Sequence, residues 1–194
     1  MTTACFLDFD HTLFDTDKFF RIDVHAAFLT RSAQVWQQSY DAVRPTGYSL
    51  QKHADEFRAR VARVLNTEIL QSFADLTRYV YPDVVPFLQQ AQQQGTPLYL
   101  LSFGNADWQQ YKVEHSGLAP YFHTRFYTAS EGKKGEVVRQ CQADRIIVVD
   151  DKSAELDAIK DAVPQAETYL INRTIPVTTC TRHKICTSLA EIIL

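Results

Sequence analysis

A short apolar segment near the start of the chain ends directly in two carboxylates, and it constrains the fold more than any other feature. The segment reads Ala4-Cys-Phe-Leu-Asp8-Phe-Asp10. Apolar runs of this length are typical of buried strands, and a carboxylate at the end of such a strand is costly unless a cation or a reactive partner lies beside it. The segment therefore predicts a buried strand that ends in a functional site.

Four further apolar runs follow along the chain, each succeeded by polar or glycine-containing sequence. Together with the first run, the expected strands cover residues 4–9, 97–102, 125–128, 145–149 and 167–171. Apolar residues at helical spacing predict helices between them, over residues 83–94, 135–142 and 153–163. This alternation is typical of an α/β fold with a mainly parallel sheet.

Residues 15–81 interrupt the alternation, because they contain two apolar stripes at helical spacing and few strand patterns. The stripes comprise Phe19, Ile22, His25, Ala26 and Leu29, and then Ala54, Phe57, Val61, Val64 and Leu65. Pro45-Thr-Gly47 is expected to form the turn between two helical hairpins. We therefore predict a small α-helical insertion over residues 15–81 and an α/β core formed by residues 1–14 and 82–194.

The composition limits the class of protein. A chain of 194 residues with a formal net charge of -3 suits one domain with an insertion, and it offers no basic surface for nucleic acid. Cys5 and Cys141 lie in or next to apolar runs and are expected to be reduced thiols. No basic N-terminal segment precedes an apolar stretch, and no run approaches the roughly 18 apolar residues of a membrane span. We expect a cytoplasmic protein without a membrane or nucleic-acid partner, and leave monomer and homodimer open.

Polar side chains follow four of the expected strands, at the edge where ligands bind in open parallel sheets. The set comprises Asp8 and Asp10, Ser102 and Asn105, Lys133 and Lys134, and Asp150 and Asp151. Carboxylates from two strands, a hydroxyl with free backbone amides, and an ammonium group are the parts that an Mg²⁺-assisted attack on a phosphate requires. The four groups therefore predict one phosphate site at this edge.

Four segments, in this order, resemble the motifs of the haloacid dehalogenase superfamily of phosphatases. They are Asp8-Phe-Asp10-His-Thr12-Leu13, Leu100-Leu-Ser102, Lys134-Gly-Glu-Val-Val, and Ile146-Ile-Val-Val-Asp150-Asp151. The third is similar to that of phosphoserine-phosphatase-like members. The resemblance implies a doubly wound, Rossmann-like core, and the insertion between the first two motifs resembles the helical C1-type cap that closes over the site.

The resemblance assigns different roles to the two first carboxylates. Asp8 would be the nucleophile that forms an aspartyl-phosphate, and Asp10 would act as general acid for the leaving alcohol and then as general base for water. In an extended backbone, residues at i and i+2 share a side, so both would face one pocket. His11, which follows Asp10 in the same loop, could touch substrate, although its side chain should face away from the Asp8 and Asp10 side.

The remaining motifs would bind the phosphate. Ser102 and the backbone around Phe103 and Gly104 would donate hydrogen bonds to the phosphoryl oxygens, with Asn105 either beside them or capping the next helix. Lys134, favoured over Lys133, would neutralise the two anions that approach one another. Either lysine could instead lie in solvent.

The same resemblance implies an Mg²⁺ site. Asp151 would be the principal ligand, supported by Asp150, with Asp8 and the backbone carbonyl of Asp10 completing the protein oxygens. Glu155 matches the position of a further acidic residue in some relatives and would contact metal-bound water. Two adjacent buried carboxylates without a cation would repel one another, which favours a metal here.

The expected activity is therefore Mg²⁺-dependent hydrolysis of a small phosphorylated metabolite. A phosphotransferase or mutase of the same superfamily remains open, as does a catalytically silent binding or regulatory protein that keeps the fold. A dehalogenase is disfavoured, because carbon–halogen cleavage needs no acid at Asp10. The substrate contacts of the insertion are left unassigned; its candidates are Arg21, His25, Arg44, Lys52 and Arg58.

Overall fold

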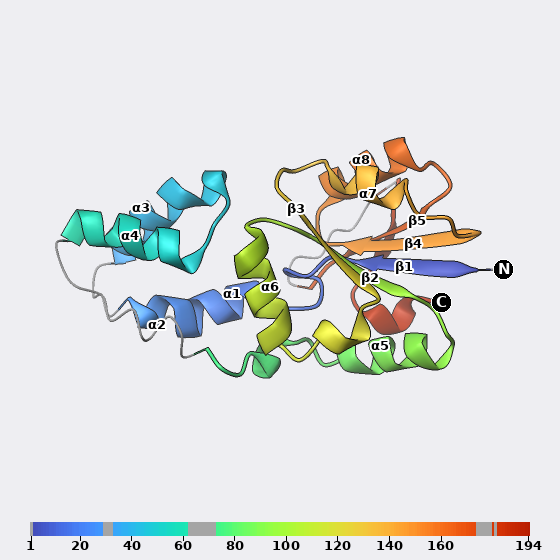
Figure 1. Ribbon diagram of the computed structural model, residues 1–194, viewed down its shortest axis with the longest axis horizontal. Helices are drawn as coiled ribbons and strands as arrows, with labels where there is room; N and C mark the ends of the chain where they lie inside the picture. The colour runs from blue at the N-terminus through green and yellow to red at the C-terminus, as the bar shows by residue number, and fades with distance from the viewer. Residues whose placement is uncertain (1, 29–32, 62–72, 174–179, 181) are drawn as a thin grey trace.

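The computed structural model describes residues 2–28, 33–61, 73–173, 180 and 182–194. Its centre is a six-stranded sheet, parallel throughout, with the strand order β3-β2-β1-β4-β5-β6 (Figure 1). The strands are β1 (Thr3–Leu7), β2 (Leu98–Phe103), β3 (Thr124–Thr128), β4 (Arg145–Asp150), β5 (Glu167–Ile171) and β6 (Lys184–Cys186). The predicted α/β fold is confirmed, and β6, whose three residues give no apolar run, was not predicted.

The first apolar segment forms the central strand β1, which is hydrogen-bonded to β2 on one side and β4 on the other. Leu7 is in register with Leu100 of β2 and with Val149 of β4. Because the three strands are parallel and in this register, the residues that follow them emerge side by side at one edge of the sheet.

Helices cover both faces of the sheet. Because successive side chains of β1 point to opposite faces, this strand packs against helices on both sides. Cys5 and Leu7 belong to the core beneath α5 (Val84–Gln93), whereas Ala4 and Phe6 belong to the core beneath α8 (Ser153–Ala162). Figure 1 shows α7 (Lys134–Val138) and α8 on one face and α5 on the other. Helix α7 ends at Val138, four residues before the predicted end, and a further helix, α6 (Ala106–His115), follows β2.

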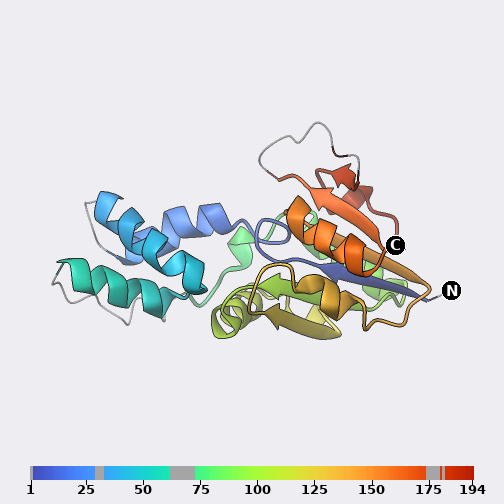
Figure 2. The same ribbon diagram turned by 90° about the horizontal axis from the view of Figure 1, so that it is seen from above.

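The insertion is helical and lies beyond the carboxyl end of β1, opposite the N-terminus in both views (Figures 1 and 2). Its helices are α1 (Thr16–Phe19), a π-helical segment Phe20–Val24, α2 (His25–Ala27), α3 (Ala33–Val43) and α4 (Leu50–Val61), with 3-10 turns at Arg44–Thr46 and Thr77–Tyr79. Ile22, within the π-helical segment, is 45 % exposed, whereas Val24 of the same segment is buried. Leu29, Val64 and Leu65 lie outside the described residues.

Two connections join the insertion to the core, and they run side by side. The Asp15 amide donates to the Tyr79 carbonyl at 2.7 Å, and the Tyr81 amide donates to the Leu13 carbonyl at 3.1 Å. Phe14 forms an isolated antiparallel bridge with Val80. The insertion therefore leaves the core and returns to it at one point, directly after the Asp8–Asp10 segment.

Two further expectations concern the state of the cysteines and the presence of membrane-spanning helices. All four cysteines are free thiols, and Cys5 and Cys186 are buried. Among the helices of the described residues, none has both the length and the apolar character that crossing a membrane requires.

Candidate active site

Three carboxylates from two neighbouring strands converge at the carboxyl edge of the sheet. Asp8 follows β1, Asp150 is the last residue of β4, and Asp151 comes next. One carboxylate oxygen from each lies within 4.8 Å of those of the other two. The Asp8 amide donates to the Val149 carbonyl at 2.9 Å, which extends the β1–β4 ladder by one bond and fixes Asp8 beside Asp150.

Lys134 supplies the cation that the sequence predicts. Its Nζ lies 2.6 Å from Asp8 Oδ1 and 2.6 Å from Asp150 Oδ2, and its side chain is buried. Lys133 is exposed and pairs with Glu136 at 2.6 Å, so Lys134 is the lysine that reaches the carboxylates. Gly135 allows this approach, since a Cβ there would lie 2.7 Å from the Ala158 carbonyl oxygen of α8.

The charges of this cluster are unbalanced. Burial, together with Asp150 and Asp151 and against the attraction of Lys134, raises the pKa of Asp8 well above its usual value. Burial and the Asp150 charge raise the pKa of Asp151 to about 6. Burial alone would lower the pKa of Lys134, but Asp8 and Asp150 raise it above its usual value. Three carboxylates with one shared ammonium are a donor set that suits a hard divalent cation such as Mg²⁺, so the residues present fit the implied metal.

Asp10 faces the same pocket but has partners of its own. Its Oδ1 accepts from the Thr16 hydroxyl and from Lys112 Nζ, both at 2.5 Å, and its Oδ2 accepts from Gln109 Nε2 at 2.8 Å. Burial alone would raise the pKa of Asp10, but Lys112 and the two hydrogen bonds outweigh it and lower the pKa to about 2. Asp10 is therefore a carboxylate held by three donors.

The second motif lies at the end of β2. Ser102 is buried within the strand, while Phe103 and Gly104 line the pocket that contains Asp8. Asn105 is the N-cap of α6, where its side-chain oxygen accepts from the Trp108 amide at 2.9 Å. Asn105 thus fixes the start of α6, the second of the two positions expected for its side chain.

Glu155 and His11 both line the pocket. Both carboxylate oxygens of Glu155 accept from the Gly132 amide, at 3.0 and 3.2 Å, so Glu155 anchors the loop that precedes Lys134. His11 lines the pocket, and the expectation that it faces away is wrong. Its φ of 59° lies in the left-handed region, so the alternation of an extended strand has already ended there.

The pocket has a volume of about 200 Å³ and lies between core and insertion. The insertion contributes Phe20, Tyr40, Arg44 and Tyr48 to its wall. Of the five unassigned polar candidates there, Arg44 is the one that lines it.

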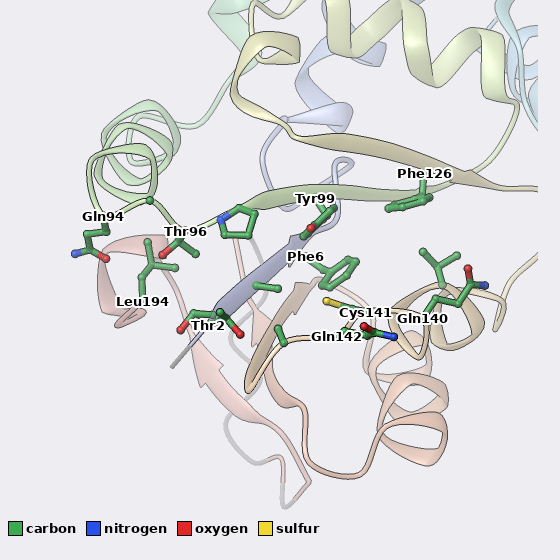
Figure 3. A pocket seen from close by; sticks show the side chains of 16 residues that line it. Thr2, Phe6, Gln94, Thr96, Tyr99, Phe126, Gln140, Cys141, Gln142 and Leu194 are labelled. Carbon is green, nitrogen blue, oxygen red and sulfur yellow. The ribbon is translucent and has the colours of Figure 1, made fainter.

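A larger cavity, of about 920 Å³, lies at the opposite, amino end of the strands (Figure 3). Figure 3 shows Phe6, Tyr99 and Phe126 on the strands, with Cys141 in the loop after α7 facing them. None of the described side chains that line it belongs to an aspartate, glutamate, histidine, lysine or arginine.

The donors around Asp10 were not predicted from the sequence. Gln109 and Lys112 are three residues apart on α6, so they share one helix face. That spacing was the available signal, but a lysine on a helix is usually solvated, and burial was needed to single out Lys112.

Comparison with known proteins agrees with the motifs. The model of the haloacid dehalogenase-like hydrolase family matches residues 2–162. No curated protein matches.

Solved structures share the fold along almost the whole chain. A haloacid dehalogenase-like hydrolase from Burkholderia xenovorans is 19% identical, with a TM-score of 0.80, covering 98% of this chain and 94% of that one. An L-2-haloacid dehalogenase is 18% identical, with a TM-score of 0.66, covering 98% of this chain and 96% of that one. A HAD phosphatase from Thermococcus onnurineus is 16% identical, with a TM-score of 0.66, covering 98% of this chain and 95% of that one. Since the family model spans most of the chain and the carboxylates and Lys134 of its motifs meet at one edge, the chain belongs to the haloacid dehalogenase-like hydrolases.

Proposed function

We propose that this hydrolase is an Mg²⁺-dependent phosphomonoesterase that acts through an aspartyl-phosphate on Asp8. The observation that carries the proposal is that carboxylate oxygens of Asp8, Asp150 and Asp151 lie within 4.8 Å of one another. The buried ammonium of Lys134 bonds two of these carboxylates, those of Asp8 and Asp150. A hydrolase that attacks a neutral carbon has no need of three clustered acids, whereas attack on a phosphate dianion requires a cation between nucleophile and substrate.

Asp8, Asp150 and Asp151, with the Asp10 carbonyl, would hold the metal. When bound, Mg²⁺ would supply positive charge that offsets the repulsion between the Asp8 carboxylate and the phosphate. Lys134 adds to this and keeps Asp8 in one orientation, because its ammonium also bonds Asp150 in the neighbouring strand.

The chain's own residues account for two displacement steps. In the first, an Asp8 oxygen forms a bond to phosphorus while the bond to the leaving oxygen breaks, and Asp10 gives that oxygen a proton. In the second, water attacks phosphorus, Asp10 takes its proton, and the Asp8 oxygen leaves. At neutral pH Asp10 is the carboxylate that the second step needs, since its pKa is about 2. For the first step the approaching phosphate dianion has to raise that pKa, as neighbouring negative charge does.

The pocket favours a small substrate. Its volume of about 200 Å³ lies below the roughly 300–1,000 Å³ of typical small-molecule pockets. Its outer wall is aromatic, through Phe20, Tyr40 and Tyr48, with Arg44 as the cation. A small phosphorylated metabolite fits this wall better than a phosphoprotein.

The product that is released separates this function from its rivals. Wild-type protein with Mg²⁺ should release phosphate from p-nitrophenyl phosphate, Asp8→Asn should release none above background, and the exposed-site control Asp41→Asn should match wild type. A dehalogenase would instead release halide from 2-chloropropionate without added metal, and a silent binding protein would release neither. A mutase would transfer phosphate between sugar phosphates without net release.

A further inference from the structure

Lys112 is a buried cation whose place in the core is unusual. Its side chain is 2% exposed, and its Nζ lies 5.4 Å from the centre of the Phe9 ring and 6.0 Å from that of Phe14. The carboxylate it reaches, at 2.5 Å, belongs to Asp10. Lysine is almost never fully buried in proteins without a specific partner.

Gln109 completes the arrangement, and a glycine leaves it room. Its Nε2 donates both to Asp10 Oδ2, at 2.8 Å, and to the Phe103 carbonyl, at 2.7 Å. A Cβ on Gly104 would lie 2.9 Å from that nitrogen, and the φ of +135° at Gly104 also disfavours any other residue. Gly104, expected to serve the phosphate alone, thus also makes space for the amide that holds Asp10.

Packing does not explain this arrangement. An apolar side chain of similar size at position 112 would lie well against Phe9 and Phe14, and replacing a buried ion pair by well-packed apolar residues is often neutral or stabilising. The pair therefore calls for a reason other than stability. Lys112 and Gln109 together bond both oxygens of Asp10, so they fix the torsion of its carboxylate as well as its charge.

We propose that Lys112 and Gln109 are positioning residues that hold the Asp10 carboxylate in the orientation from which it exchanges protons with the leaving oxygen and the attacking water. This inference rests on the proposed phosphomonoesterase function. Proton transfer needs the donor and acceptor atoms within hydrogen-bond reach, and a displacement of about 1 Å can lower a rate by roughly 100-fold.

A double-mutant cycle between Asp10→Asn and Lys112→Met tests the proposal, with kcat and KM measured on an alkyl phosphate such as β-glycerophosphate. We expect Lys112→Met to lower kcat by about 10- to 100-fold and to leave KM within about 3-fold, since the residue acts through Asp10 rather than on the substrate. In the Asp10→Asn background, the same change should lower kcat by less than about 2-fold. If the two losses multiply instead, Lys112 has a structural role alone and the proposal is wrong.

A second cycle, between Asp10→Asn and Gln109→Leu, keeps the test valid if Lys112→Met does not fold. The same non-additive loss is expected, and multiplied losses would again overturn the proposal. Gln110→Leu is the matched control, because Gln110 is the exposed neighbour on the same helix and bonds Glu114; it should keep wild-type kcat. Thermal unfolding of every variant shows whether a lost rate follows lost stability, which would point to structure alone.

The leaving group gives a readout that a structural role would not change. p-Nitrophenolate leaves without a proton, whereas an alkoxide does not, so Lys112→Met should lower kcat/KM, which reports the leaving-group step alone, more for β-glycerophosphate than for p-nitrophenyl phosphate. Equal losses on both substrates would contradict the proposal. Should wild type hydrolyse neither substrate, the proposed function itself fails; an active wild type with additive cycles leaves that function standing and removes only this inference.

Discussion

The ammonium group of Lys134 lies 2.6 Å from the carboxylate of Asp8, and both side chains are buried. Asp8 follows the central strand β1 and Lys134 is the first residue of α7, so this pair joins the end of β1 to the start of α7 at the edge where chemistry is expected. Removing one partner of a buried ion pair is strongly destabilising, because it leaves the other charge uncompensated in the interior.

Lys134→Met should therefore abolish measurable phosphate release, by about 1,000-fold or more, since Asp8 loses both its orientation and its neutralising charge. The exposed neighbour Lys133 provides the matched control, and Lys133→Met should retain wild-type kcat. Circular dichroism and thermal unfolding establish that the Lys134 variant is folded. A folded Lys134→Met protein with wild-type rates would contradict the role assigned to this lysine.

Magnesium affinity should fall as the pH is lowered through about 6, where Asp151 takes up a proton. Its pKa is raised in the folded chain, so the metal-free protein behaves in the opposite sense: the contribution of this group to the free energy of unfolding increases as the pH falls from about 6 toward 3.8. Thermal unfolding of wild type and Asp151→Asn, with and without Mg²⁺ at pH 7.5 and pH 5, measures both effects, because the difference between the two proteins separates Asp151 from other groups that titrate in this range. An Mg²⁺-induced rise in Tm that is equal at the two pH values would count against Asp151 as a ligand.

The insertion should have its own pH dependence, through His53. Burial lowers the pKa of His53 to about 4, against the opposing hydrogen bond to the Trp36 carbonyl, and its ring lies between Tyr48 OH at 3.1 Å and Ser39 Oγ at 2.9 Å. The unfolded chain binds this proton near pH 6.5, so the free energy of unfolding should fall as the pH drops from 6.5 to 4, by on the order of 3 kcal/mol.

Urea unfolding of wild type, His53→Leu and His123→Gln at pH 7.5 and pH 5 measures that dependence. His53→Leu should be less stable at pH 7.5 but lose less stability on acidification than wild type. The exposed His123 serves as the control and should keep the wild-type pH difference. A pH difference that is the same in His53→Leu and wild type would show that another group is responsible.

The sheet and the carboxylate cluster could be predicted from the sequence, because both depend on short apolar runs and on the residues that directly follow them. Asp8 and Asp150 directly follow or end apolar runs, and parallel strands bring such positions together whatever the rest of the chain does. The mainly parallel sheet followed from the same runs, and its doubly wound form from the family resemblance. The short strand β6 and the early end of α7 could not be predicted. Three residues such as Lys184–Cys186 are too few to show a pattern that distinguishes a strand from a loop.

The partners of Asp10 depend on tertiary packing, and the sequence did not reveal them. Lys112 is 102 positions from Asp10, on a helix whose apolar pattern is weak, and only its burial against Phe9 and Phe14 distinguishes it from a solvated lysine. The orientation of His11 was predicted wrongly because its φ is positive, and the side-chain alternation of an extended strand no longer holds there. Local patterns thus located the reacting groups, while packing determined how they are held.

The most direct test of the central claim is mass spectrometry of the Asp8 peptide after rapid acid quench of a single turnover. The protein, in excess over p-nitrophenyl phosphate, is mixed with this substrate and Mg²⁺ in ¹⁸O-water. We expect transient addition of one phosphoryl group at Asp8, with ¹⁸O appearing in the released phosphate and not in the Asp8 carboxylate, because water attacks phosphorus. Phosphate release without a phosphorylated Asp8, or ¹⁸O in the Asp8 carboxylate, would contradict the account.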